Sequence, residues 1–77
     1  MYMRKFIVSN HAKQRMALRG ISMKMIKDTI LRSEDNGIGD FGRLLAFKSF
    51  SKGLMKVVYV RGERTCHIVS VIWEKVN

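Results

Sequence analysis

The fold is decided at residues 9–22, which read SNHAKQRMALRGIS. Ser9 and Asn10 are residue types that cap the start of a helix, and Gly20 is the type that ends one in the left-handed conformation. The stretch between these signals therefore predicts a two-turn helix over His11–Arg19.

A second helix is predicted directly after the first. Ser22 is its expected N-cap, and Ile21 and Ile26 occupy the two positions of a hydrophobic staple, one before the cap and one at the fourth helical residue. Ile26 and Ile30 share one apolar stripe, so this helix should pack on the rest of the chain and end near Arg32.

The segments around these helices are β in character. Residues that favour strands gather in four runs, which are Arg4–Val8, Arg43–Phe50, Leu54–Arg61 and Thr65–Lys75. Short separators that contain glycine join the last three runs as antiparallel hairpins, and residues 36–40 are expected as a loop because they are rich in Gly, Asn and Asp. The order β-α-α-β-β-β predicts an α+β fold with two N-terminal helices on one antiparallel sheet, as a single domain over residues 1–77.

The charge of the chain indicates its partners. Lys and Arg number 15 against 6 Asp and Glu, which gives a net charge of +9. Residues 1–33 contain one acid, Asp28, and residues 41–61 contain none. This segregation predicts a basic face that binds nucleic acid or an acidic protein, although a merely soluble surface would also be basic.

Composition also excludes several kinds of site. The single cysteine, Cys66, excludes an intramolecular disulfide and is expected in the core. The chain has no Cys and His at metal-ligand spacing, so we expect a site with no metal and no cofactor. The longest apolar runs fall far short of the roughly 20 residues of a membrane helix. We therefore expect a cytoplasmic protein that does not enter a membrane.

His11, Arg15 and Arg19 form one stripe of the first predicted helix, because at about 100° per residue they step by about 40° each. This stripe lies within or along the edge of the face that should meet the sheet, where a purely structural helix carries aliphatic residues. Two interpretations remain open. The stripe binds an anionic ligand, or His11 bonds locally while Arg15 sends its guanidinium into solvent.

The predicted strands supply further candidates. His67 is the second side chain that can transfer protons near neutral pH, although an exposed strand position explains it equally well. Side chains that could contact phosphate or reacting groups on the strands and their turns are Arg43, Lys56, Arg61, Arg64 and Ser70. Solvation alone is the simpler explanation for each turn arginine.

Residues 11–22, HAKQRMALRGIS, resemble the signature His-Ala-x-x-Arg-Met-x-x-Arg-Gly-Ile-Ser of a family of small, uncharacterised bacterial and phage proteins. That family in turn resembles RelE/ParE-type toxins and, more broadly, metal-independent RNases of the barnase–colicin–RelE kind. The resemblance implies two helices over a curved antiparallel sheet, with a cleft between helix and sheet that handles an RNA phosphodiester. Only His11, Arg15 and Arg19 match the signature itself.

We therefore expect a toxin-like, metal-independent endoribonuclease that acts on RNA, including ribosome-associated RNA. The expected catalytic residues are His11, Arg15 and His67, and the expected RNA-binding residues are Arg19, Arg43, Lys56, Arg61 and Arg64. The alternative is a non-catalytic basic binding module, either a nucleic-acid binder or an inhibitor of a host factor encoded by a phage or mobile element.

A protein partner is also expected. Met23 and Met25, near the start of the second helix, exceed what a thin core can obviously absorb, and methionine is common on surfaces that accept another chain. We expect a protein antitoxin or a homo-oligomer contact over part of that helix.

Overall fold

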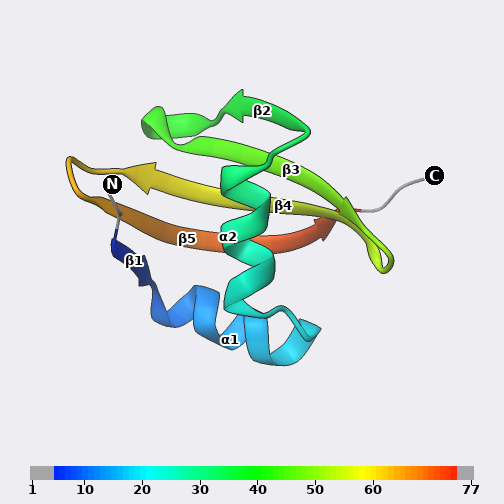
Figure 1. Cartoon of the computed structure of the whole chain (residues 1–77). Coiled ribbons are helices and arrows are strands. Elements are labelled where there is room, and N and C mark those ends of the chain that lie inside the picture. The colour runs from blue at the N-terminus through cyan, green and yellow to red at the C-terminus, as the bar shows by residue number, and fades with distance from the viewer. Residues whose placement is uncertain (1–4, 75–77) are drawn as a thin grey trace.

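The computed structural model describes residues 5–74, whose elements follow in the order β-α-α-β-β-β-β (Figure 1). Both helices lie on one side of the sheet, so the predicted α+β class is confirmed. Arg4 and Lys75, predicted in the first and last strands, lie outside the described residues. The elements are β1 (Lys5–Val8), α1 (Asn10–Arg19), α2 (Met23–Leu31), β2 (Asp35–Ile38), the 3-10 helix η1 (Asp40–Gly42), β3 (Leu44–Phe50), β4 (Gly53–Arg61) and β5 (Thr65–Glu74).

The five strands form one sheet in the order β1-β5-β4-β3-β2. Neighbours from β5 to β2 are antiparallel, and of these the hairpin signals predict the pairings of β5 with β4 and of β4 with β3. The exception is β1, which pairs in parallel with β5, from Lys5 opposite Thr65 to Val8 opposite Ile68. A parallel pair needs a long connection between its strands, and here the two helices and three strands in between supply it.

Strand β2 occupies residues where the sequence predicts a loop. Its Gly37 lies opposite Leu45 of β3, and a Cβ built on Gly37 would lie 3.4 Å from Leu45 Cδ1. The leucine side chain thus fills the space that the glycine leaves. Pairing with β3 therefore prevails over the turn preference of the Asn36-Gly37 pair.

The predicted caps determine where the helices begin and end. Ser9 Oγ accepts a hydrogen bond from the Ala12 N–H at 3.0 Å, and Ser22 Oγ accepts one from the Met25 N–H at 3.2 Å. Gly20 ends α1 with φ +64°, in the left-handed region that glycine adopts without strain. The two caps and the glycine stop are confirmed as predicted, because each of these signals acts within a few residues.

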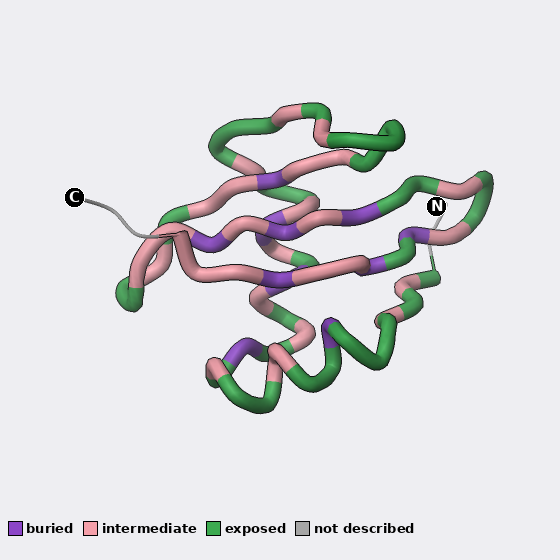
Figure 2. Tube along the Cα trace, turned by 180° about the vertical axis from the view of Figure 1, so that it is seen from behind, coloured by how far each residue is buried: buried purple, intermediate pink, exposed green. Residues whose placement is uncertain are grey.

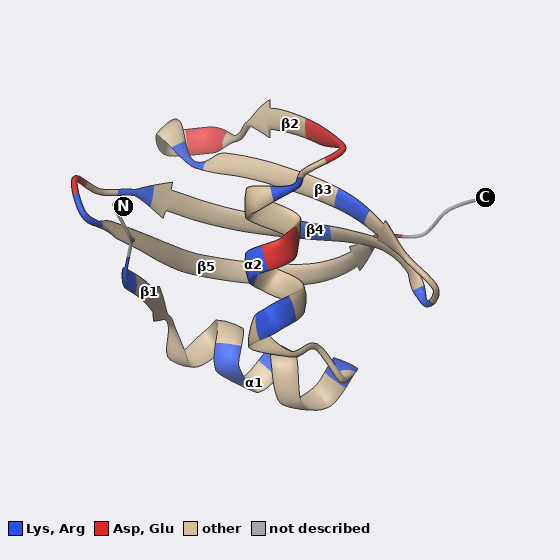
Figure 3. Cartoon of the chain, viewed as in Figure 1, with Lys and Arg blue, Asp and Glu red and all other residues tan. Residues whose placement is uncertain are grey.

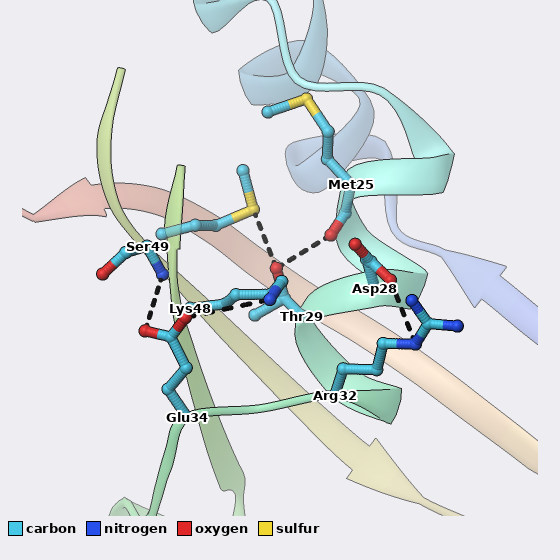
Figure 4. Close-up of polar contacts among 8 residues, drawn as sticks. Met25, Asp28, Thr29, Arg32, Glu34, Lys48 and Ser49 are labelled. Carbon is cyan, nitrogen blue, oxygen red and sulfur yellow. Dashed lines mark hydrogen bonds and ion pairs between the residues drawn. The ribbon is translucent and has the colours of Figure 1, made fainter. Parts of the chain in front are cut away.

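The core lies between the helices and one face of the sheet. Thr29 of α2 is fully buried there; its hydroxyl donates to the Met25 main-chain oxygen at 2.8 Å and lies 3.4 Å from Met55 Sδ (Figure 4). The apolar core consists of Ala12, Ile21 and Ile26 from the helical half and Ala46, Met55, Val57, Tyr59, Cys66, Ile68 and Val71 from the strands.

A β-bulge at Val69 decides which side chains of β5 enter this core. The pairing between β4 and β5 skips Val69, so the alternation of side chains reverses its phase there. As a result Cys66 and Ile68 before the bulge, and Val71 and Trp73 after it, all face the helices.

Candidate functional site

Helix α1 lies along the edge of β5, beyond the point where β1 ends (Figure 1). The Ser9 N–H donates to the Ile68 oxygen at 3.1 Å, and the Ser9 hydroxyl donates to the Val69 oxygen at 3.2 Å. Farther along, Arg19 Nη1 donates to the Val71 oxygen at 3.4 Å. Polar groups of α1 and its cap therefore satisfy carbonyls that a sixth strand would otherwise reach.

The three residues of the predicted α1 stripe have different surroundings. Ala12 is the residue that α1 buries completely; His11 beside it is exposed, whereas Arg15 and Arg19 are half-buried. Within residues 5–74, the side chains of His11 and Arg15 make no hydrogen bond or ion pair. Arg19 already bonds to β5, so His11 and Arg15 are the members of the stripe that remain available to a ligand.

His67 lies on the face of the sheet that the helices leave uncovered. It is exposed and stands between Ile7 of β1 and Val60 of β4. Ala12 of α1 packs in the core on the other face. His67 and His11 thus lie near the same β1–β5 edge of the sheet. His67 is on the uncovered face, whereas α1 packs on the face that carries the core.

The remaining predicted cations are spread over the sheet. Arg61 and Arg64 are exposed on either side of the β4–β5 turn. Arg43 lies ahead of β3, with its guanidinium carbon 5.9 Å from the centre of the Phe41 ring. Lys56 Nζ is 3.5 Å from a carboxylate oxygen of Glu74, so its charge is largely neutralised within the chain.

Charge is separated across the sheet (Figure 3). Residues 5–27, which include β1, α1 and most of α2, contain no Asp or Glu. Glu34, Asp35 and Asp40 instead lie in and beside β2 and η1, at the opposite edge of the strand order. We give the name basic edge to the cations and His11 of β1 and α1 together with Lys52, which lies beside the end of α1; it consists of Lys5, His11, Lys13, Arg15, Arg19 and Lys52.

Lys52 belongs to the basic edge although sequence reasoning did not single it out. It lies in the turn between β3 and β4, and a Cβ built on Gly20 would lie 3.0 Å from its Nζ. The C-terminal end of a helix attracts cations, which accounts for this position beside the end of α1. Its sequence context, Ser51-Lys52-Gly53, signals only a turn, so no local pattern could have placed it there.

Glu34 and Asp28 each make contacts with a neighbouring cation. Glu34 lies between α2 and β2, with one carboxylate oxygen 3.8 Å from Lys48 Nζ and the other accepting a hydrogen bond from the Ser49 N–H at 3.1 Å (Figure 4). Asp28 and Arg32 form an ion pair at 3.8 Å on α2. These contacts pair Glu34 with a cation of β3 and Asp28 with Arg32 at the end of α2, and not with the cations of α1.

The region between the helices and the sheet is occupied by the buried core, so exposed surface is where a ligand would meet the residues above. No group of three or more His, Cys, Asp or Glu side chains within residues 5–74 is arranged to hold a metal ion. In that same range no helix has the length and apolar character needed to cross a membrane.

Comparisons with known proteins identify the family. Neither the curated proteins nor the solved structures gave a match to this chain. The model of one family of uncharacterised domains matches residues 8–73, which includes α1, α2 and β2 to β4 completely and β5 as far as Trp73. The chain therefore belongs to the family described as domain of unknown function DUF4258.

Proposed function

We propose that the protein is a metal-independent endoribonuclease that binds RNA through its basic edge. The lack of acids in residues 5–27 carries this proposal, because the cations of β1 and α1 have no carboxylate on their own elements, while Glu34, Asp35 and Asp40 lie at the opposite edge of the sheet. RNA phosphates are attracted to such a surface, and binding releases their counterions. The resemblance of residues 11–22 to the signature associated with RelE/ParE-type toxins supports the same class of substrate.

RNA cleavage without a metal needs three kinds of group. A base takes the proton of the 2′-hydroxyl, the 2′-oxygen attacks phosphorus, and an acid protonates the 5′-oxygen as the P–O5′ bond breaks. Cations stabilise the phosphorane that forms between these steps. His11 and His67 are the two candidate imidazoles for proton transfer, and the guanidinium of Arg15 is the candidate phosphate clamp. Because His67 lies on the uncovered face and α1 on the other, one phosphodiester can use both imidazoles only where the RNA crosses the β1–β5 edge of the sheet.

A binding module that does not cleave RNA is the second candidate, and one observation favours it. His67 lies on the uncovered face of the sheet, whereas Ala12 anchors α1 to the other face. The Arg19 guanidinium also donates its hydrogen bond within the chain, to the Val71 oxygen. In this alternative the basic edge holds RNA while His67 is an ordinary exposed strand residue.

Single-turnover cleavage of a labelled RNA in the presence of EDTA separates the two candidates. An endoribonuclease gives fragments with 2′,3′-cyclic phosphate and 5′-hydroxyl ends, and His11→Ala, His67→Ala and Arg15→Ala each lower the rate by about 100-fold or more. Arg32→Ala is the matched control, because Arg32 is paired with Asp28 on α2.

The same RNA distinguishes the outcomes. If the RNA is bound but stays intact, and Arg15→Ala weakens binding more than Arg32→Ala, the protein is the binding module. If the parent protein neither binds nor cuts RNA at low salt, both candidates are wrong.

A further inference from the structure

The uncovered face of the sheet carries a group of apolar side chains around the ion pair between Lys56 and Glu74. Residues that alternate with the buried Ala46 and Val57 point away from the helices. Seen from behind, the strands lie nearest the viewer and no described helix crosses them (Figure 2). We call the central part of this face the apolar patch, which consists of Leu45, Phe47, Leu54, Val58 and Ile72.

The register gathers these five side chains around Lys56. Val58 of β4 pairs with Leu45 of β3, and Ile72 of β5 pairs with Lys56, which in turn pairs with Phe47. All five apolar residues remain partly accessible to solvent. An antiparallel sheet with one open face normally carries polar side chains there, so a large apolar patch of this kind indicates an interface.

We propose that the apolar patch is the contact between two copies of this chain, packed sheet against sheet. The first argument is charge. The patch contains one ion pair, between Lys56 and Glu74 at 3.5 Å, which cancels its own charge. The surplus cations of the +9 chain lie on the helices, β1 and the turns, so an acidic partner would be drawn to those surfaces and not to this one.

The second argument concerns the repulsion between copies. Packed sheets lie about 10 Å apart, and each helix layer would lie on the outer side of its own sheet. The cations of α1 and α2 in the two copies would then be separated by well over the Debye length of about 8 Å at physiological salt. A net charge of +9 on each chain is therefore compatible with this dimer.

The third argument is area. Five strands about 4.8 Å apart, with about 3.3 Å per residue along β3 to β5, present a face on the order of 600 Å². A standard interface buries about 800 Å² per partner, so even the whole face is smaller than that and the expected dimer is weak. The patch is a separate surface from the contact predicted over α2, where Met23 and Met25 are partly buried against the core.

Analytical ultracentrifugation across micromolar concentrations tests the proposal. The parent chain should reach twice its 8.9 kDa mass, and Val58→Lys should remain a monomer because two lysines would meet in the interface. Leu18→Lys adds the same charge to a side chain of α1 that is 79% exposed, so it should dimerise like the parent. Circular dichroism checks that each variant keeps the fold.

Two milder variants decide the matter if Val58→Lys fails to fold. Glu74→Gln leaves Lys56 unpaired in the interface, and Val58→Thr replaces a methyl group with a hydroxyl; each should raise the dimer Kd about tenfold. A parent chain that is monomeric up to about 100 μM, or a folded set of variants that all dimerise equally, would overturn the proposal. The proposal would also be overturned if an acidic protein bound the parent chain and Leu18→Lys but did not bind Val58→Lys.

Discussion

The indole N–H of Trp73 donates a hydrogen bond to the main-chain oxygen of Arg19 at 3.2 Å. This carbonyl belongs to the last turn of α1, where main-chain oxygens have no partner within the helix. Because the Arg19 guanidinium reaches back to the Val71 oxygen, the end of α1 and the end of β5 hold each other from both sides. The position of the basic edge on the sheet depends on this junction.

Replacing Trp73 with Phe should lower the free energy of unfolding by about 1–2 kcal/mol, because the ring is largely kept while the donor to Arg19 is lost. Urea denaturation measures the difference. Phe50→Leu is the control, since it removes the edge-on ring contact with Trp73, whose centroids are 6.2 Å apart, and keeps the hydrogen bond. Equal stability of Trp73→Phe and the parent would show that the junction contributes nothing.

Ser9→Ala should cost more stability than Ser22→Ala. Among the described residues the Ser22 side chain makes only the cap bond to the Met25 N–H, worth about 1 kcal/mol, whereas the Ser9 side chain caps α1 and also donates to the Val69 oxygen of β5. We expect a loss of about 2 kcal/mol for Ser9→Ala, measured by thermal or urea unfolding. The opposite ranking would mean that the contact with Val69 does not stabilise the protein.

Gly20→Ala and Gly42→Ala test backbone strain at two sites. Both glycines have positive φ, +64° and +71°, so alanine should cost about 1 kcal/mol at each. Nothing lies within 4 Å of a Cβ at Gly42, whereas a Cβ at Gly20 meets the flexible end of Lys52 at 3.0 Å. Because that ammonium can move, the two losses should be similar. A much larger loss at Gly20 that Lys52→Ala relieves would show that the lysine is held rigidly.

RNA binding should depend steeply on salt, and Arg15→Ala should reduce the slope of log K against log salt concentration by about one. The guanidinium of Arg15 pairs with no carboxylate within residues 5–74, so it is free to neutralise a phosphate. Arg32→Ala should leave the slope nearly unchanged because Asp28 already neutralises Arg32. Fluorescence anisotropy with a labelled RNA measures both. Identical slopes for the two variants would remove Arg15 from the interface.

Sequence reasoning succeeded where the physical cause is local. The caps Ser9 and Ser22, the stop at Gly20 and the staple residues Ile21 and Ile26 act within one helical turn, and the structure has all of them in their expected places. The three C-terminal strands also begin and end close to their predicted bounds.

Sequence reasoning failed where the structure of a segment depends on a residue far along the chain. No residue close to Gly37 in the sequence indicates that Gly37 pairs with Leu45, so the sequence predicts a loop where β2 lies. Val69 looks like any other strand residue, yet the bulge there determines that Val71 enters the core. The prediction of the site is limited in the same way, because only the tertiary arrangement shows that Lys56 is neutralised by Glu74 and that Lys52 approaches Gly20.

The parallel pairing of β1 with β5 has a consequence for how the protein is made. The hydrogen bond from Ser9 to Val69 spans 60 residues, and at about 5–20 residues per second a ribosome needs roughly 3–12 s to add that length of chain. During this interval β1 and α1 have left the ribosome before the strand that they pack against has been synthesised. The nascent basic segment is thus present, beside the RNA of the ribosome itself, before β5 is available to hold it in its folded position.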